Sequence, residues 1–320
     1  MDCDTIYHYC SLSTFLTIID KKTLRLSNVL KSNDYLERKY VLLQCEDLIV
    51  DQILYQIEKT GYPCNETQRR YYDLVMRKTL SDTIRFFDDY STVSHVMCFS
   101  RNKDLLSQWC GYADDGKGVA IGFSRKALER FLGNRQHIDL VDVFYGTPTA
   151  VLEERTASIV KKYFQISRKY DQNLFQIEGH MKNVCEALVC HYFLNDGLKY
   201  KKSDFREEEE VRLMLRVPPQ EFGELTQESN ETFIDRLQSD INPLRVIYDF
   251  IPKGNKVVSY YDIYFGGKEI DPCITHEFIK EIVIGPKADI SIPEMAHILR
   301  SKKGLNIAAQ NITKSGASYR

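Results

Sequence analysis

The acidic run from Phe205 to Val217 holds the residues best suited to chemistry. If this run forms a strand, the apolar positions 211, 213, 215 and 217 share its buried face, and Glu208, Glu210 and Arg212 share the other face. Two carboxylates on one face of a strand destabilise it unless a cationic ligand or a developing positive charge offsets them. The run therefore predicts either a site that stabilises a cation or a solvated acidic strand end screened by its arginines.

His8 is a second candidate, because it lies between Tyr7 and Tyr9 just before a helix-start signal at Ser11. A neutral imidazole can hydrogen-bond a ribose hydroxyl, and a neighbouring aromatic ring can stack on a planar base. The alternative interpretation is that His8 is a core residue whose ring nitrogens are satisfied within the fold.

Ser100 and Trp109 form a third group of candidates. Ser100 ends an apolar strand pattern, where its hydroxyl could reach a ligand, and Trp109 is the single tryptophan of the chain, in a polar connection that continues to Tyr112. Trp109 either fills the core or forms the wall of a cleft with Tyr112.

Common enzyme templates are absent from the sequence. It contains no glycine-rich phosphate loop, zinc-ligand spacing, nucleophile elbow or His-Glu-x-x-His motif. Carboxylates suit Mg²⁺, so Asp34, Glu208 and Glu210 could hold that ion in a nuclease-like hydrolase. The main interpretation involves no metal.

Composition limits the class of protein. The chain has 320 residues, 43% of them hydrophobic, and its 43 basic and 45 acidic residues give no overall attraction to nucleic acid or anionic membranes. No apolar stretch approaches the roughly 20 residues that cross a bilayer, and the first residues do not resemble a signal peptide. Nine scattered cysteines suit free thiols in a reducing compartment. We therefore expect a cytoplasmic protein without a membrane partner.

Hydrophobic periodicity predicts how these candidates are positioned. It indicates strands at 5–10, 22–27, 95–100, 119–123, 138–144, 205–217, 257–265 and 281–284, and helices at about 15–20, 33–58, 66–90, 124–131, 150–196 and 292–300. No repeat or linker divides the chain. We expect a single α+β domain over residues 1–320, with helical insertions at about 33–90 and 150–200.

Several short motifs follow one another along nearly the whole chain. They are Tyr7-His8-Tyr9, Leu24 to Ser27, Asn33-Asp34 with Glu37, Cys98 to Ser100, Trp109 with Tyr112, Gly118-Val119, Gly122-Phe123, Lys201, Phe205, Glu208, Glu210, Arg212, Ile282 to Lys287, Ser315 and Tyr319. Their order resembles the domain of unknown function 2971 family of bacterial proteins. The chain differs from the family at two positions, with Phe205 where the family more often has Trp and Tyr35 where it more often has Pro.

A second resemblance, to the ADP-ribosyltransferase superfamily, concerns mechanism. The order of a His-Tyr strand, an aromatic-Ser strand and a late Glu-x-Glu strand is similar in both. The resemblance implies a split mixed β-sheet and NAD as the substrate. It also implies that His8 holds the adenosine-side ribose, with Tyr7 and Tyr9 beside it, and that Phe99 and Ser100 line the nicotinamide pocket.

The same resemblance implies roles for the acidic run. Glu210 binds the 2′-hydroxyl of the nicotinamide ribose and stabilises the oxocarbenium ion, and Glu208 orients the acceptor. Because they are cations near the same strand, Lys201 and Arg212 are expected to orient these carboxylates or contact the NAD pyrophosphate. We expect Trp109 and Tyr112 to border the pocket or brace its wall, because loops between core strands often carry function.

Three functions remain open from the sequence. The first is an ADP-ribosyltransferase or NAD glycohydrolase, acting as a toxin, an anti-phage effector or a modifier of an unidentified protein or nucleic acid. The second is a non-catalytic module of the same fold that binds a nucleotide or a partner protein, and the third is the Mg²⁺-dependent nuclease. The first hypothesis places His8, Ser100 and Glu210 in one pocket.

Overall fold

The computed structural model describes residues 4–29, 40–59, 65–90, 95–133, 135, 137–146, 149–170, 179, 182–186, 197–216, 244–265, 278–301 and 307–319. The chain forms two compact units. The first comprises Met1–Ser32, Val93–Val143 and Asp204–Arg320, and the second comprises Asn33–Thr92 and Phe144–Ser203. Both expected helical insertions fall within the second unit. That residues 1–320 form a single domain stays a prediction.

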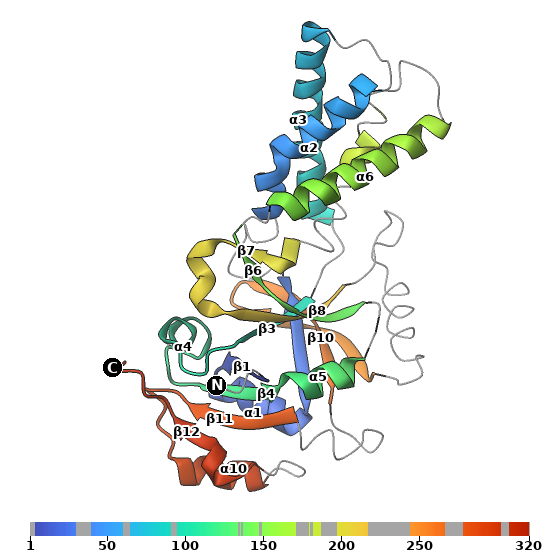
Figure 1. The fold of residues 1–320 in the computed structure, drawn as a ribbon. Coiled ribbons are helices and arrows are strands. Elements are labelled where there is room, and N and C mark those ends of the chain that lie inside the picture. The colour runs from blue at the N-terminus through green and yellow to red at the C-terminus, as the bar shows by residue number, and fades with distance from the viewer. Residues whose placement is uncertain are drawn as a thin grey trace. The chain divides into compact units, whose positions relative to one another are not determined.

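The first unit is built on one sheet, which has ten strands in the described part of the chain (Figure 1). The described pairings in this sheet are antiparallel except that of β11 with β12, so the expected mixed sheet is confirmed. The strands are β1 (Thr5–Cys10), β2 (Thr23–Asn28), β3 (His95–Ser100), β4 (Val119–Ser124), β5 (Ile138–Asp142), β8 (Glu210–Leu215), β9 (Val246–Lys253), β10 (Lys256–Tyr264), β11 (Ile279–Ile284) and β12 (Ile312–Lys314).

The sheet branches at β3. One edge of β3 pairs with β8 along the whole strand, and β8 pairs in turn with β5. The other edge is shared, because β1 pairs with β3 at Ser100 and β2 pairs with it at His95 and Val96. Strands β4, β11 and β12 continue beyond β1, and strands β10 and β9 continue beyond β2. Three arms of the sheet therefore meet at one central strand.

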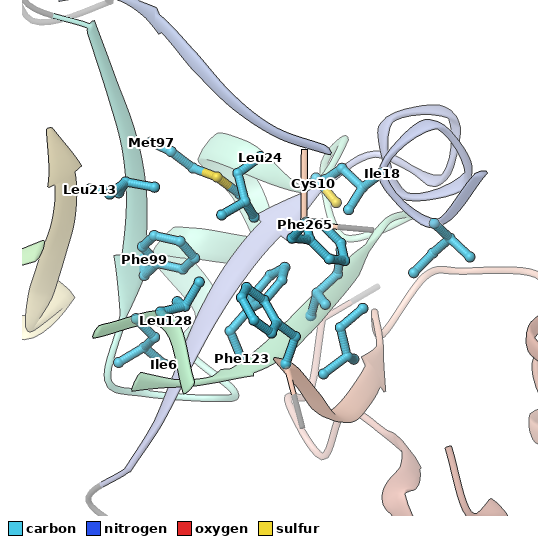
Figure 2. Close-up of a cluster of buried hydrophobic side chains, with 14 of the residues drawn as sticks. Ile6, Cys10, Ile18, Leu24, Met97, Phe99, Phe123, Leu128, Leu213 and Phe265 are labelled. Carbon is cyan, nitrogen blue, oxygen red and sulfur yellow. The ribbon is translucent and has the colours of Figure 1, made fainter. Parts of the chain in front are cut away.

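Alternation along the strands gives the sheet two different faces. On the face that we call the core face, Ile6, Phe99, Phe123 and Leu213 are almost completely buried, and their side chains point toward one another (Figure 2). The rings of Phe99 and Phe123 meet edge to face with centroids 5.7 Å apart. Cross-strand partners share a face, so the opposite face, which we call the polar face, carries Tyr7, Ser100, Glu210 and Arg212.

Three helices complete the apolar core of the first unit: α1 (Leu12–Lys21), α5 (Arg125–Leu132) and α10 (Ile292–Ser301). The expected helix start at Ser11 is confirmed, because its hydroxyl accepts a hydrogen bond from the Thr14 amide at 3.2 Å. The helix ends at Lys22, which has a left-handed conformation (φ 53°) and whose amide donates to the Ile18 carbonyl.

Some elements of the first unit differ from the expectation. Residues Leu106–Tyr112 form helix α4 rather than an irregular connection, and strands β9 and β12 were not predicted. Helix α4 is short and has no side-chain cap, so the local sequence contains little that predicts a helix start there. The sequence also predicts an irregular or helical stretch at about 230–242, which lies outside the described residues.

The second unit is mainly helical. It contains α2 (Tyr40–Lys59), α3 (Glu66–Tyr90), α6 (Thr149–Tyr170), the 3-10 helix η4 (Gly197–Lys199) and a parallel pair of short strands, β6 (Phe144–Tyr145) and β7 (Tyr200–Lys201). Ile49, Ile53 and Ile57 recur every four residues along α2 and are fully buried, with Met76 of α3 and Leu152 of α6 in the same cluster. Within the described residues, no helix is both long and apolar enough to cross a membrane.

Candidate functional site

The acidic run changes direction at Glu209. Residues Ser203–Glu208 form a 3-10 helix, Glu209 has a left-handed conformation (φ 42°), and strand β8 begins only at Glu210. Non-glycine residues seldom adopt a positive φ, because the Cβ atom crowds the backbone. The expectation that Glu208 and Glu210 belong to one strand, with both side chains on the same face, is therefore wrong. The expected burial of Val211, Leu213 and Leu215 is confirmed.

Glu210 and Arg212 form a bidentate ion pair on the polar face. Arg212 Nε donates to Glu210 Oε1 and Arg212 Nη2 donates to Oε2, both at 2.8 Å. The two side chains are 7% and 2% exposed, so the pair is withdrawn from water. The guanidinium fork matches both carboxylate oxygens, which fixes the orientation of the carboxylate. Arg212 thus holds the Glu210 carboxylate, one of the two carboxylates that Lys201 and Arg212 are expected to orient.

Ser100 lies beside this pair, because it is the direct partner of Glu210 in the β3–β8 register. Its hydroxyl donates to the Glu208 carbonyl at 2.7 Å and accepts from the Asn102 amide at 3.0 Å. The Arg101 amide also donates to the Glu209 carbonyl, at 3.0 Å. Ser100 is 1% exposed. The hydroxyl therefore joins the end of β3 to the segment that enters β8.

Tyr7 shares the polar face with Ser100 and Glu210. It is the partner of Ser100 in the β1–β3 register, and its hydroxyl donates to Glu281 Oε1 at 2.5 Å across β4. Gly122 of β4 lies between them, and a Cβ atom there would be 2.8 Å from Glu281 Cγ and 3.1 Å from Tyr7 Cε1. Glycine at this position therefore permits the contact between Tyr7 and Glu281. Sequence reasoning missed Glu281, because its partner lies two strands away.

His8 lies on the core face, on the other side of the sheet from Glu210. Its register partner Ile121 is a core residue, and its ring meets that of Phe99 at 5.9 Å. Its Nδ1 is 2.9 Å from the Cys98 carbonyl, which can only accept, so this nitrogen carries the proton. Loss of solvation by burial lowers the pKa of His8, against the smaller opposing effect of this hydrogen bond. The prediction that His8, Ser100 and Glu210 face one pocket is wrong, because adjacent residues of β1 alternate between faces.

Tyr9 and Trp109 form a separate buried cluster on the polar face. Their rings meet edge to face at 4.7 Å, and Trp109 is fully buried, so the core interpretation of Trp109 is confirmed. The Tyr9 hydroxyl donates to the Asn102 carbonyl and accepts from the Leu105 amide. Burial raises the pKa of Tyr9. Tyr112 is half exposed at the end of α4.

Asp104 is a further residue that sequence reasoning missed. Its Oδ1 accepts from Trp109 Nε1 at 2.7 Å and from the Ser315 hydroxyl at 2.5 Å, and its Oδ2 accepts from the Gly316 amide at 2.7 Å. A buried indole N–H needs an acceptor, so the aspartate five residues before the single tryptophan was a usable signal.

The remaining candidates lie elsewhere. Lys201 belongs to β7 of the second unit, where it is buried and its carbonyl accepts from the Gly146 amide. Asn33, Asp34 and Glu37 lie outside the described residues. Among the residues that are described, no group of three or more His, Cys, Asp or Glu side chains could hold a metal ion.

The match to known proteins covers about the middle third of the chain. Residues 108–213 match the model of a family described as "Protein of unknown function (DUF2971)". The matched segment contains Trp109, Tyr112, Glu208, Glu210 and Arg212, and it supports the first of the two resemblances. Comparisons with curated proteins and with solved structures gave no match.

Proposed function

We propose that this chain cleaves the nicotinamide–ribose bond of NAD, as an ADP-ribosyltransferase or NAD glycohydrolase. The observation that carries the proposal is the Glu210 carboxylate, which is held by the Arg212 guanidinium in the strand position next to Ser100. A fixed carboxylate is suited to a transition state with positive charge on a sugar, since no reorganisation is needed when that charge develops. The branched sheet is also consistent with the split sheet implied by the ADP-ribosyltransferase resemblance.

In the proposed reaction, the bond between the ribose C1′ and the nicotinamide nitrogen breaks, and its electron pair leaves with neutral nicotinamide. Glu210 stabilises the resulting oxocarbenium ion until water or an acceptor oxygen attacks C1′ and loses a proton. Tyr7 and Ser100 are register partners in β1 and β3, and both share the face of Glu210. The proposal therefore assigns Tyr7 and Ser100, rather than His8, to the site with Glu210. A toxin or anti-phage role in a bacterial cytoplasm belongs to the same proposal.

A non-catalytic binding module is the second candidate, favoured by two observations. His8 and Glu210 lie on opposite faces, and Arg212 occupies both oxygens of Glu210. A bidentate guanidinium offsets much of the negative charge that an oxocarbenium ion needs. Such a module would bind a nucleotide or a partner protein without turning over NAD.

The first test is nicotinamide release by the purified protein from millimolar NAD, with and without EDTA. Release in both conditions is the expected result. Binding of NAD without release would favour the binding module. Absence of both binding and release would remove the NAD proposal, and hydrolysis of nucleic acid that EDTA abolishes would favour the nuclease instead.

A variant then tests Glu210 itself. Glu210→Gln should reduce nicotinamide release by at least about a hundredfold, because it removes the charge while keeping the shape of the side chain. Glu207→Gln is the matched control, since Glu207 is exposed in the same acidic run. Near-ultraviolet circular dichroism would show whether the variant keeps its tertiary packing. A folded Glu210→Gln protein with normal release would exclude Glu210 from the chemistry.

A further inference from the structure

The segment Ser315–Tyr319 is held against two loops of the first unit. Its first contact is with Asp104, which accepts hydrogen bonds from the Ser315 hydroxyl at 2.5 Å and the Gly316 amide at 2.7 Å. Both bonds end on a carboxylate, and such charge-assisted bonds are stronger than bonds between neutral groups. The Ser315 amide also donates to the Ile284 carbonyl at 2.8 Å, directly after the parallel β11–β12 pairing.

Its second contact is with the turn at residues 114–118. The Tyr319 hydroxyl donates to Asp115, and the Lys287 ammonium lies 2.9 Å from the same carboxylate and 3.7 Å from the centroid of the Tyr319 ring. The hydrogen bond from Tyr319 and the ion pair with Lys287 lower the pKa of Asp115. This turn is strained, because Asp114 and Asp115 both have positive φ values, 50° and 56°.

A chain of hydrogen bonds leads from Asp104 to the proposed site. The Asp104 amide donates to Asn102 Oδ1 at 3.1 Å, and the Asn102 amide donates to the Ser100 hydroxyl at 3.0 Å. The Ser100 hydroxyl donates to the Glu208 carbonyl at 2.7 Å. The Tyr9 hydroxyl, which binds both Asn102 and Leu105, fixes the loop at residues 101–105 against β1. Each step joins groups that belong to the same compact unit.

We propose that Ser315 and Asp104 are positioning residues, through which the 315–319 segment holds the Ser100 end of β3 and the entry to β8 in register. The consequence for catalysis rests on the proposed function, but the positioning itself does not. The left-handed residue Glu209 lies at this junction, and a strained conformation persists only when surrounding contacts hold it. The Arg101 amide and the Ser100 hydroxyl supply such contacts, and the 315–319 segment holds the loop that follows them through Asp104.

Hydrogen–deuterium exchange of the full-length protein tests the positioning directly. Ser315→Ala removes the charge-assisted bond to Asp104 and the hydrogen bond that the Ser315 hydroxyl accepts from the Ala317 amide. Protection should therefore fall by about tenfold in residues 101–112 and also in residues 203–210. Ser315→Thr keeps the hydroxyl and should restore protection. Ser318→Ala is the matched control, because Ser318 is exposed in the same segment.

The results separate this proposal from the proposed function. Unchanged exchange in residues 101–112 of Ser315→Ala would overturn the proposal that the 315–319 segment holds this loop. Failure of Ser315→Thr to restore protection would overturn it as well. Increased exchange in residues 101–112 with unchanged exchange in residues 203–210 would overturn positioning of the site. If the protein releases nicotinamide, Ser315→Ala should lower kcat by about tenfold with KM unchanged. If it does not, the exchange experiment still tests whether the 315–319 segment positions these residues.

Fluorescence of Trp109 gives a second readout, because it is the single tryptophan and its indole N–H binds Asp104. Asp104→Asn replaces one acceptor oxygen with a donor group, so the emission of Trp109 should shift to longer wavelength and its quenching by acrylamide should increase. Ser318→Ala should leave both unchanged. An unaltered emission spectrum in a folded Asp104→Asn protein would contradict the role of Asp104.

Discussion

The two faces of the sheet differ in what holds their side chains together. On the core face, aliphatic and aromatic groups such as Phe99, Phe123 and Leu213 pack without polar partners. On the polar face, side chains are tied in specific pairs: Glu210 with Arg212, Tyr7 with Glu281, and Arg25 of β2 with Asp262 of β10 at 2.7 Å. The core face can therefore tolerate apolar exchange of similar volume, whereas each pair of the polar face depends on both partners.

The comparison also indicates where function resides. Burial of the apolar face stabilises the fold in proportion to area and has little directional specificity. A buried ion pair contributes little net stability, because the loss of solvation opposes the attraction. The polar face thus carries oriented groups that are costly to bury and whose pairs contribute little net stability, which is why the proposed site is assigned there.

The largest expected effect comes from the core face. Phe123→Ala should lower the free energy of unfolding by about 3–5 kcal/mol, because it leaves a cavity among the rings shown in Figure 2. Phe250→Ala is the matched control, since Phe250 is 57% exposed on β9 and should change stability by less than about 1 kcal/mol. Urea denaturation followed by circular dichroism measures both. Equal losses would remove the distinction between core and exposed aromatic residues.

An effect of similar size is expected on the polar face, where a second substitution should reverse it. Arg212→Met should lower stability by about 3–5 kcal/mol, because it leaves the Glu210 carboxylate buried without its guanidinium. The double variant Glu210→Leu with Arg212→Met should recover most of this loss or exceed the wild-type stability. A double-mutant cycle in urea tests the coupling. If the two single losses simply add, the pair is not the energetic unit that the geometry indicates.

A smaller effect is expected at Glu209, the left-handed residue before β8. Glu209→Gly should raise stability by about 1 kcal/mol, because glycine adopts a positive φ without crowding at Cβ. Glu207→Gly, in the preceding 3-10 helix, should instead lower it by about 0.5–1 kcal/mol. Thermal melting of the two variants tests whether their stabilities change in opposite directions. A loss of stability in Glu209→Gly would show that its side chain contributes more than its backbone strain removes.

The smallest effect concerns pH and the core face. Because burial lowers the pKa of His8 below its ordinary value of 6.5, the unfolded chain takes up a proton at a higher pH than the folded protein. Its contribution to stability is therefore complete above pH 6.5 and is lost as the pH falls from there through the folded pKa. His8→Gln should flatten this part of the stability–pH curve, measured by urea denaturation at a series of pH values. A curve unchanged by His8→Gln would contradict the assigned cause.

Much of the first unit could be predicted from local patterns. Strands β1, β3 and β4 occur at the expected residues, since alternation of apolar and polar side chains is a property of consecutive positions. Helix α4 and strand β9 were missed for opposite reasons: α4 is short and uncapped, and β9 is exposed along most of its length. The four cysteines with described side chains are free thiols, as expected, and of these Cys10 and Cys185 are buried.

The sequence by itself determined which residues of the acidic run are apolar and buried, because Val211, Leu213 and Leu215 repeat with the period of a strand. Only the tertiary structure decided that β8 begins at Glu210, since the left-handed turn at Glu209 is held by the amide of Arg101 and the hydroxyl network of Ser100. Only strand pairing decided that Tyr7 rather than His8 shares a face with Glu210. Alternation with a period of two fixes which residues of one strand share a face. Which residues of different strands share a face depends on the register of strand pairing, and therefore on contacts between residues far apart in the chain.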